Sequence, residues 1–205
     1  MTHILCGNYT AATTEADELV TLAVEKGALQ WKATGMLNQG CLLALTGKAS
    51  EAVHLISSSL PARASAGAPV NVPAFLSYLA IGHAELGQFD EAWRRIEEAI
   101  ATIKTTKERW FEAEVHRLAG EIALKLPEPD AAKAEPYFER ALAVARQQQA
   151  KSWELRAAMS MARLWRDQGK REEARELLAP VYGWFTEGFD TLDLEEAKGL
   201  LNELA

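Results

Sequence analysis

The stretch Gly87-Gln88-Phe89-Asp90-Glu91-Ala92 combines a turn-forming glycine with an alanine five residues later, and its recurrence decides the fold. The same spacing occurs three more times, at Gly7/Ala12, Gly47/Ala52 and Gly169/Ala174. Successive alanines are 40, 40 and 82 residues apart, and Ala134 splits the last interval into 42 and 40. A fixed period of this length is the signature of a repeat architecture.

Each repeat reads as two helices joined by a tight turn. Around Gly87, residues that can pack in a core recur at three- and four-residue spacings: Leu76, Leu79 and His83 before it, and Ala92, Ile96 and Ala99 after it. We expect Gly87 to end the first helix in a left-handed conformation and Asp90 to cap the second helix. No segment shows the alternation of a strand bounded by hairpin turns.

The alanines after each turn need to be small because paired helices approach closely there. Larger residues follow four positions later, at Ile56, Ile96, Phe138 and Leu178, and a second small residue lies in each first helix, at Gly40, Ala80, Ala119 and Ala162. This arrangement resembles the tetratricopeptide repeat (TPR). The resemblance implies an all-α, right-handed α-α superhelix, a TPR-like solenoid of helix pairs about 40 residues long.

A narrower resemblance lies in the second half of the chain. It is most specific at SWELRAA (152–158) and LLAPVYGWFTEGFDT (177–191). These stretches resemble the C-terminal repeat region of bacterial signalling proteins that carry a class III adenylate/guanylate cyclase and a STAND or AAA-type ATPase. The resemblance implies signal transduction, but no cyclase or ATPase motif can be carried over to this chain.

The period predicts a single repeat domain over 1–205. Its expected parts are a partial repeat at 1–28, repeats at 29–68, 69–108, 109–150 and 151–186, and a capping helix within 187–205. Because Gly7 already occupies the turn position, the chain is expected to begin in the middle of a repeat, either as a fragment of a longer protein or as a natural short one. The last segment holds six acidic residues against one lysine and should solvate the end of the solenoid.

Composition excludes several classes of protein. The net charge of −7 and the lack of a dense basic patch argue against nucleic acid and anionic membranes as partners. No apolar run is long enough to cross a bilayer and no leader is recognisable, so a cytoplasmic location is expected. Two cysteines and four scattered histidines predict neither a disulfide scaffold nor a metal site, and no cofactor is expected.

Several motifs have a structural interpretation that we favour over a chemical one. Leu45-Thr46-Gly47-Lys48 is a helix-pair turn because it lacks the first glycine of a phosphate loop. The cysteines should be inert, His83 should pack between helices, and Glu112, Glu114 and Glu121 should form a solvated face. Three tryptophans recur with the repeat, 21 to 24 residues before one of its alanines: Trp31, Trp110 and Trp153. We expect each to anchor its repeat to the preceding one. Trp184 and its neighbours either pack the capping helix or form an exposed aromatic patch.

The first helices of a solenoid line its concave side. Carrying the groove positions of the resembled repeat onto this chain gives a candidate partner-binding set: Leu37, Cys41, Ser77, Ile81, His116, Arg156, Met159, Arg163 and Arg166. The groove would be apolar at first and basic at its C-terminal end. A helix or extended peptide with an apolar stretch and acidic residues would suit it.

These features predict a protein that is not an enzyme. The leading expectation is a protein-protein interaction scaffold, which binds a protein or peptide or other domains of a cyclase/ATPase protein. The alternative is a regulatory domain that senses a small ligand. A deep apolar pocket would favour this alternative. Self-association is also expected, because the partial first repeat leaves the apolar edge of the helix at 11–26 uncovered and favours a homodimer.

Overall fold

The computed structural model describes residues 1–65 and 70–205, and every regular element in those ranges is an α-helix. The chain separates into two compact units, Met1–Phe111 and Glu112–Ala205, which we call unit 1 and unit 2. The prediction of an all-helical chain is therefore confirmed. The predicted boundary between residues 68 and 69 lies outside the described residues.

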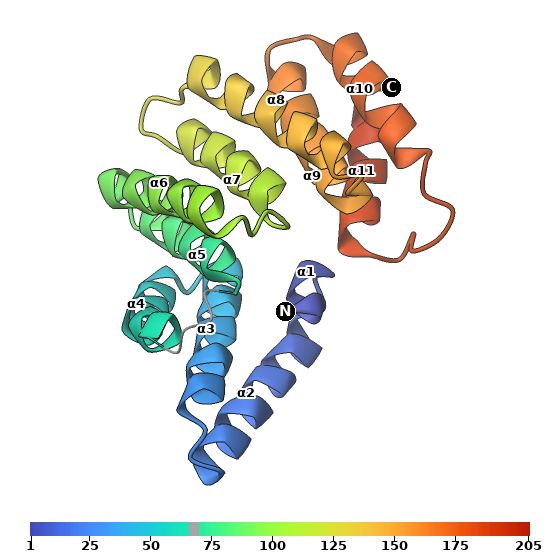
Figure 1. Ribbon diagram of the computed structural model, residues 1–205. Helices are drawn as coiled ribbons and strands as arrows, with labels where there is room; N and C mark the ends of the chain where they lie inside the picture. The colour runs from blue at the N-terminus through green and yellow to red at the C-terminus, as the bar shows by residue number, and fades with distance from the viewer. Residues whose placement is uncertain (66–69) are drawn as a thin grey trace. The chain divides into compact units, whose positions relative to one another are not determined.

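Unit 1 is built from antiparallel helices packed side by side (Figure 1). Its helices are α1 (Thr2–Leu5), α2 (Tyr9–Glu25), α3 (Leu29–Leu45), α4 (Ala49–Ser65), α5 (Val72–Glu85) and α6 (Phe89–Thr106). Each helix packs on the next in the order α1 to α6, and α3 also contacts α5. Contact between the first helices of successive pairs is compatible with an α-solenoid.

Unit 2 repeats this pattern and adds a terminal helix. Its helices are α7 (Glu112–Leu124), α8 (Ala131–Gln147), α9 (Lys151–Asp167), α10 (Arg171–Tyr182) and α11 (Leu192–Glu203). The first helices α7 and α9 touch each other, as α3 and α5 do in unit 1. The last helix, α11, packs against both α9 and α10.

The turn inside a helix pair follows the glycine prediction. Gly87 has a φ of 72°, in the left-handed region, and the next amide, that of Gln88, donates to the carbonyl of His83 at 2.9 Å. This bond satisfies a carbonyl that the helix end leaves open. The predicted Asp90 cap is wrong, since α6 begins at Phe89 after Gln88 and has no side-chain cap.

Side-chain caps do occur in the described residues at the starts of two other helices. Asn8 accepts from the amide of Ala11 at the start of α2, and Asp130 accepts from the amide of Lys133 at the start of α8. Each directly precedes the first helical residue, the position where a carbonyl-bearing side chain reaches the free amides. Asp90 lies one residue inside its helix and is therefore too late in the sequence to act in this way.

The core uses the small and large positions that the repeat predicted. The four large residues Ile56, Ile96, Phe138 and Leu178 are fully buried. A Cβ built on Gly40 would lie 2.5 Å from Cγ1 of Ile56, and one on Gly120 would collide with the ring of Phe138. Since interiors are close-packed, these glycines are what lets each first helix approach its partner.

The three tryptophans that recur with the repeat have different surroundings. Trp153 packs against a buried cluster of Ala113, Val144 and Ala145, as expected for an anchor on the preceding helix pair. Trp110 donates to the carboxylate of Glu108 at 2.8 Å. Trp31, in contrast, is 59% exposed. The anchor prediction therefore holds for Trp153 but not for Trp31.

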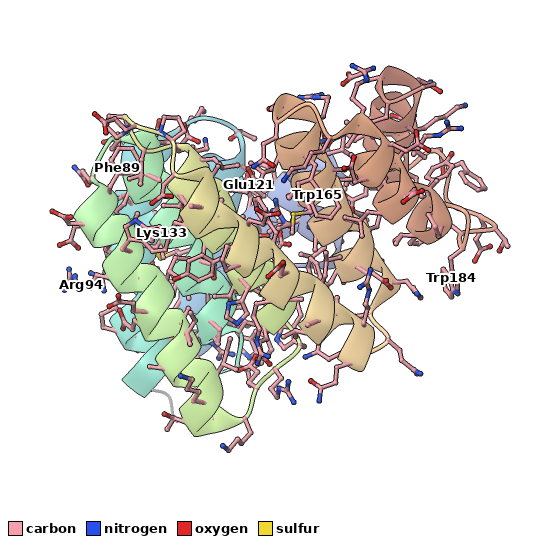
Figure 2. All side chains as sticks on the ribbon, turned by 90° about the horizontal axis from the view of Figure 1, so that it is seen from above. Phe89, Arg94, Glu121, Lys133, Trp165 and Trp184 are labelled. Carbon is pink, nitrogen blue, oxygen red and sulfur yellow. The ribbon has the colours of Figure 1, made fainter. Side chains whose placement is uncertain are left out.

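The loop between α10 and α11 carries the less periodic aromatic residues. Trp184 is exposed and projects from this loop at the edge of unit 2 (Figure 2). It meets Phe185 edge-to-face, with ring centroids 5.2 Å apart, and the ammonium of Lys151 lies 5.7 Å from its ring. Of the two predicted alternatives, the exposed aromatic patch fits Trp184.

Candidate interaction face

Most predicted groove residues of unit 1 are interior residues. Leu37, Cys41 and Ser77 are fully buried, and the Ser77 hydroxyl donates to the carbonyl of Pro73 at 2.8 Å. Burial raises the pKa of the Cys41 thiol well above its ordinary range, so this cysteine stays protonated and unreactive. Only Ile81 of this group is partly accessible to a partner.

In unit 2, the predicted residues on α9 include a row of arginines that contact the protein's own C-terminal helix. Arg156 pairs with Asp193, with 2.7 Å from Nε to Oδ2, and Arg163 pairs with Glu196 at 2.8 Å. Arg166 pairs with Glu203. The three pairs follow the same order along both helices, so α11 runs in the same direction as α9 across the predicted basic end of the groove.

The helix α11 is an amphipathic acidic helix. Its apolar face consists of Leu194, Ala197 and Leu200, all buried, and Leu204 directly after it is buried too. The outer ion pairs, those of Arg163 and Arg166, are solvent-exposed and so each contributes at most about 1 kcal/mol. Apolar burial therefore supplies most of the stability of the contact, and the charges set its direction and register.

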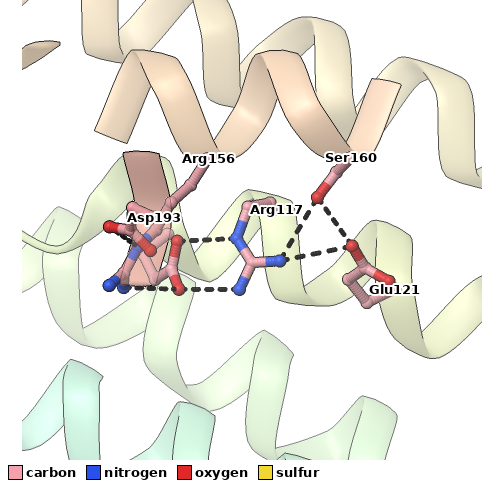
Figure 3. A network of polar contacts seen from close by, with 6 residues as sticks. Arg117, Glu121, Arg156, Ser160 and Asp193 are labelled. Carbon is pink, nitrogen blue, oxygen red and sulfur yellow. Dashed lines mark hydrogen bonds and ion pairs between the residues drawn. The ribbon is translucent and has the colours of Figure 1, made fainter. Parts of the chain in front are cut away.

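Beside Arg156 lies a network of polar contacts that joins three helices (Figure 3). Arg117 of α7 binds Glu114 with Nε at 2.8 Å and Nη2 at 2.7 Å. Nη1 of Arg117 also lies 3.2 Å from Glu121, whose carboxylate accepts from the Ser160 hydroxyl at 2.6 Å. Arg156 of α9 lies 3.6 Å from Glu114, which links this network to Asp193 of α11.

The two inner carboxylates of the network respond differently to their surroundings. Burial opposes ionisation of Glu114, but Arg117 and Arg156 together outweigh it and hold its pKa below the usual value of 4.5. Burial raises the pKa of Asp193 above its usual value of 3.8, and Arg156 offsets only part of this effect because Glu114 acts in the opposite direction. Arg156 is therefore shared by a firmly ionised carboxylate and one that accepts a proton more readily.

The interpretation of Glu112, Glu114 and Glu121 as a solvated face is wrong for the first two. Glu112 and Glu114 are 8% and 4% exposed. Arg117 is three residues after Glu114 and four before Glu121, a spacing that does predict ion pairs on one helix. The other members of the network are Arg156 on α9 and Asp193 on α11. They lie 42 and 79 residues after Glu114, and no local sequence pattern indicates them.

The remaining predicted residues of unit 2 are packed to different degrees. Met159 is buried, and His116 is half-buried, with its ring stacked on Tyr137 at 6.3 Å between centroids. Like His83, which is buried and contacts Gln88 at 2.7 Å, His116 has a packing role. The accessible part of the predicted set in unit 2 thus consists mainly of arginine side chains.

The stretch Leu45–Ser50 spans the turn between α3 and α4, as the sequence predicted for it. Within the described ranges, no group of three or more His, Cys, Asp or Glu residues is placed to hold a metal ion. In the same ranges, no helix combines the length and the apolar character that crossing a membrane requires. No protein-family model and no curated protein matches the chain.

Proposed function

We propose that the chain is a non-catalytic protein-interaction module of TPR-like type, with the arginine-bearing face of α9 as a binding site for acidic amphipathic helices. The observation that carries the proposal is the seating of α11 on this face. Three arginines meet three carboxylates in the same order along the two helices, and the apolar side of α11 is buried. A face that holds one acidic helix has the chemistry to hold another.

The TPR-like superhelix is part of the same proposal. Its support is the packing of antiparallel helix pairs, the contact of first helix with first helix, and the small residues opposite large ones. The module would act within a signalling protein, as the resemblance at 152–158 and 177–191 implies. Its partner would be a protein segment with acidic residues on one side of an apolar stripe.

In this proposal α11 competes with the partner. A helix tethered by the short loop after α10 has an effective concentration in the millimolar range, so a partner in trans binds weakly until α11 loosens. Weakening the outer pairs of α11 should therefore strengthen binding in trans. Binding of a partner at this face would then depend on whether α11 is seated on α9 as well as on the concentration of the partner.

A labelled peptide with the sequence of residues 191–205 is a suitable probe, because it reproduces the helix already seated on α9. Binding to the full chain is measured by fluorescence anisotropy for the wild type and for Glu196→Ala with Glu203→Ala, which removes two exposed carboxylates. We expect the variant to bind the peptide about fivefold to tenfold more tightly.

The control adds Arg163→Glu and Arg166→Glu to the loosened variant. Both arginines are partly exposed, so the helix itself tolerates the change. The peptide should then lose its binding. Equal affinity in all three proteins would show that this face does not select acidic helices, and the proposed site would be wrong.

A further inference from the structure

Unit 1 contains the counterpart of a cluster that is buried in unit 2. Trp31 is the third residue of α3, and Trp153 is the third residue of α9. The offset of 122 residues between them also relates Leu22 to Val144 and Ala23 to Ala145. These residues occupy equivalent positions in two copies of the repeat.

The two copies differ in what covers them. In unit 2, Val144 and Ala145 are 1% and 0% exposed, and Ala113 from the first helix of the pair completes the cluster under Trp153. In unit 1, Leu22 is 53% exposed and Trp31 is 59% exposed.

Leu22 and Trp31 line the same apolar hollow, in which Ala23 stays buried at 4% exposed. Leu19, Leu22, Ala23, Ala28 and Trp31 line a hollow of about 380 Å³, with Lys26 at its side. We call Leu19, Leu22 and Trp31 the N-terminal apolar patch. Soluble proteins rarely leave such a surface open unless something binds there.

The charged residues beside the patch are complementary to the same residues of a second copy. Glu18, Leu22 and Lys26 follow one another at four-residue steps and so lie on one face of α2. When two copies of α2 cross antiparallel at Leu22, Glu18 of each copy comes beside Lys26 of the other. A two-fold axis repeats every contact, so both ion pairs form at once. Both side chains are exposed, and the pair that Lys26 makes with Glu25 at 2.9 Å is itself solvent-exposed, so exchanging it for Glu18 of a second copy costs little.

We infer that the N-terminal apolar patch is the interface with a second copy of this chain, with α2 against α2 and Leu22 at the two-fold axis. The second copy would take the role that α7 has beside α8 and Trp153, because it covers Leu22 and Trp31 with a helix. The inference goes beyond the proposed function and is independent of it, since all its residues belong to unit 1.

Sedimentation equilibrium of the full chain tests the interface. The wild type should be a dimer that dissociates on dilution, whereas Leu22→Glu and Trp31→Glu should be monomers at the same concentrations. Trp184→Glu is the matched control, since Trp184 is 57% exposed against 59% for Trp31, and it should remain a dimer. A wild type that stays monomeric at several hundred micromolar would overturn the inference, as would a dimer that Leu22→Glu leaves intact.

A charge swap tests the antiparallel arrangement. Glu18→Lys alone and Lys26→Glu alone should each weaken the dimer about tenfold, because one substitution breaks two symmetry-related pairs. The double variant should restore the wild-type dissociation constant. A double variant as weak as the single ones would contradict the placement of α2 against α2.

Discussion

Arg117 donates two hydrogen bonds to the buried carboxylate of Glu114, from Nε at 2.8 Å and from Nη2 at 2.7 Å. Arg156 approaches the same carboxylate from α9 at 3.6 Å. Glu114→Ala would leave two largely buried guanidinium groups without this partner, and we expect it to lower the stability of unit 2 by about 3–5 kcal/mol. Hydrogen exchange of the α7 and α9 amides measures this loss for unit 2 alone.

The matched control for this prediction is Glu91→Ala. Glu91 pairs with Arg94 three residues later, as Glu114 does with Arg117, but its side chain is 43% exposed. Solvent screens this pair, so its removal should leave the protection of α5 and α6 unchanged. Comparable destabilisation by the two substitutions would mean that burial of the network is not what makes it important.

Acid should weaken unit 2 through Glu114. The pKa of this group is lower in the folded state than its ordinary value of 4.5, so its stabilisation is present above pH 4.5 and is lost as the pH falls through the folded pKa. The raised pKa of Asp193 acts with the opposite sign and reduces the net loss.

Unfolding free energy measured by hydrogen exchange between about pH 3 and pH 7 should therefore fall less steeply in Glu114→Gln than in the wild type. Glu154, whose pKa is also lowered while Lys151 and Arg146 pair with it, accounts for part of the slope that remains. Identical slopes in the two proteins would contradict the role assigned to Glu114.

Two glycines should respond in opposite ways to the same substitution. Gly120→Ala places a Cβ against the ring of Phe138 and should destabilise unit 2 by about 1–3 kcal/mol. Gly199, inside α11, has nothing within 4 Å of an added Cβ, so Gly199→Ala should stabilise its helix by about 0.5–1 kcal/mol. Thermal unfolding of the two variants measures the sign of each change in stability. A Gly120→Ala variant more stable than the wild type would contradict the close approach of α7 and α8.

The two cysteines should differ sharply in reactivity. Cys6 is exposed, whereas Cys41 is buried and its thiol has a raised pKa. A thiol reagent at neutral pH should label one cysteine per chain quickly and the second only on unfolding. Cys6→Ser should remove the fast phase. A fast phase that persists in Cys6→Ser would show that Cys41 of α3 is not buried as described.

Local rules of the sequence account well for the helix pairs. The spacing from Gly87 to Ala92 encodes a left-handed turn followed by a close contact, and both depend on only a few neighbouring residues. Ile96 and Phe138 follow from the same period, and both are buried. The fine position of a cap was less predictable, because Asp130 directly precedes the first residue of α8 whereas Asp90 is the second residue of α6, a difference of two positions.

The candidate face was only half predictable. The row of Arg156, Arg163 and Arg166 follows from the repeat register, but their pairing with α11 depends on how a loop of nine residues, 183–191, returns the chain to α9. The acidic composition of α11 is compatible with a helix that faces solvent at the end of the repeats and with one that binds the arginines of α9. Charge composition alone therefore could not distinguish the two. Trp31 illustrates the same limit, because its register matches Trp153 while its surroundings do not.

Competition between α11 and an added acidic helix shows whether the arginine-bearing face of α9 binds such helices. Hydrogen exchange of the full-length chain is followed while the peptide of residues 191–205 is titrated in, with the peptide's own signals separated by mass. We expect α11 of the chain to lose protection in a saturable way as the peptide takes its place on α9, while α7 and α8 keep theirs. Peptide binding that leaves the protection of α11 unchanged would contradict this expectation.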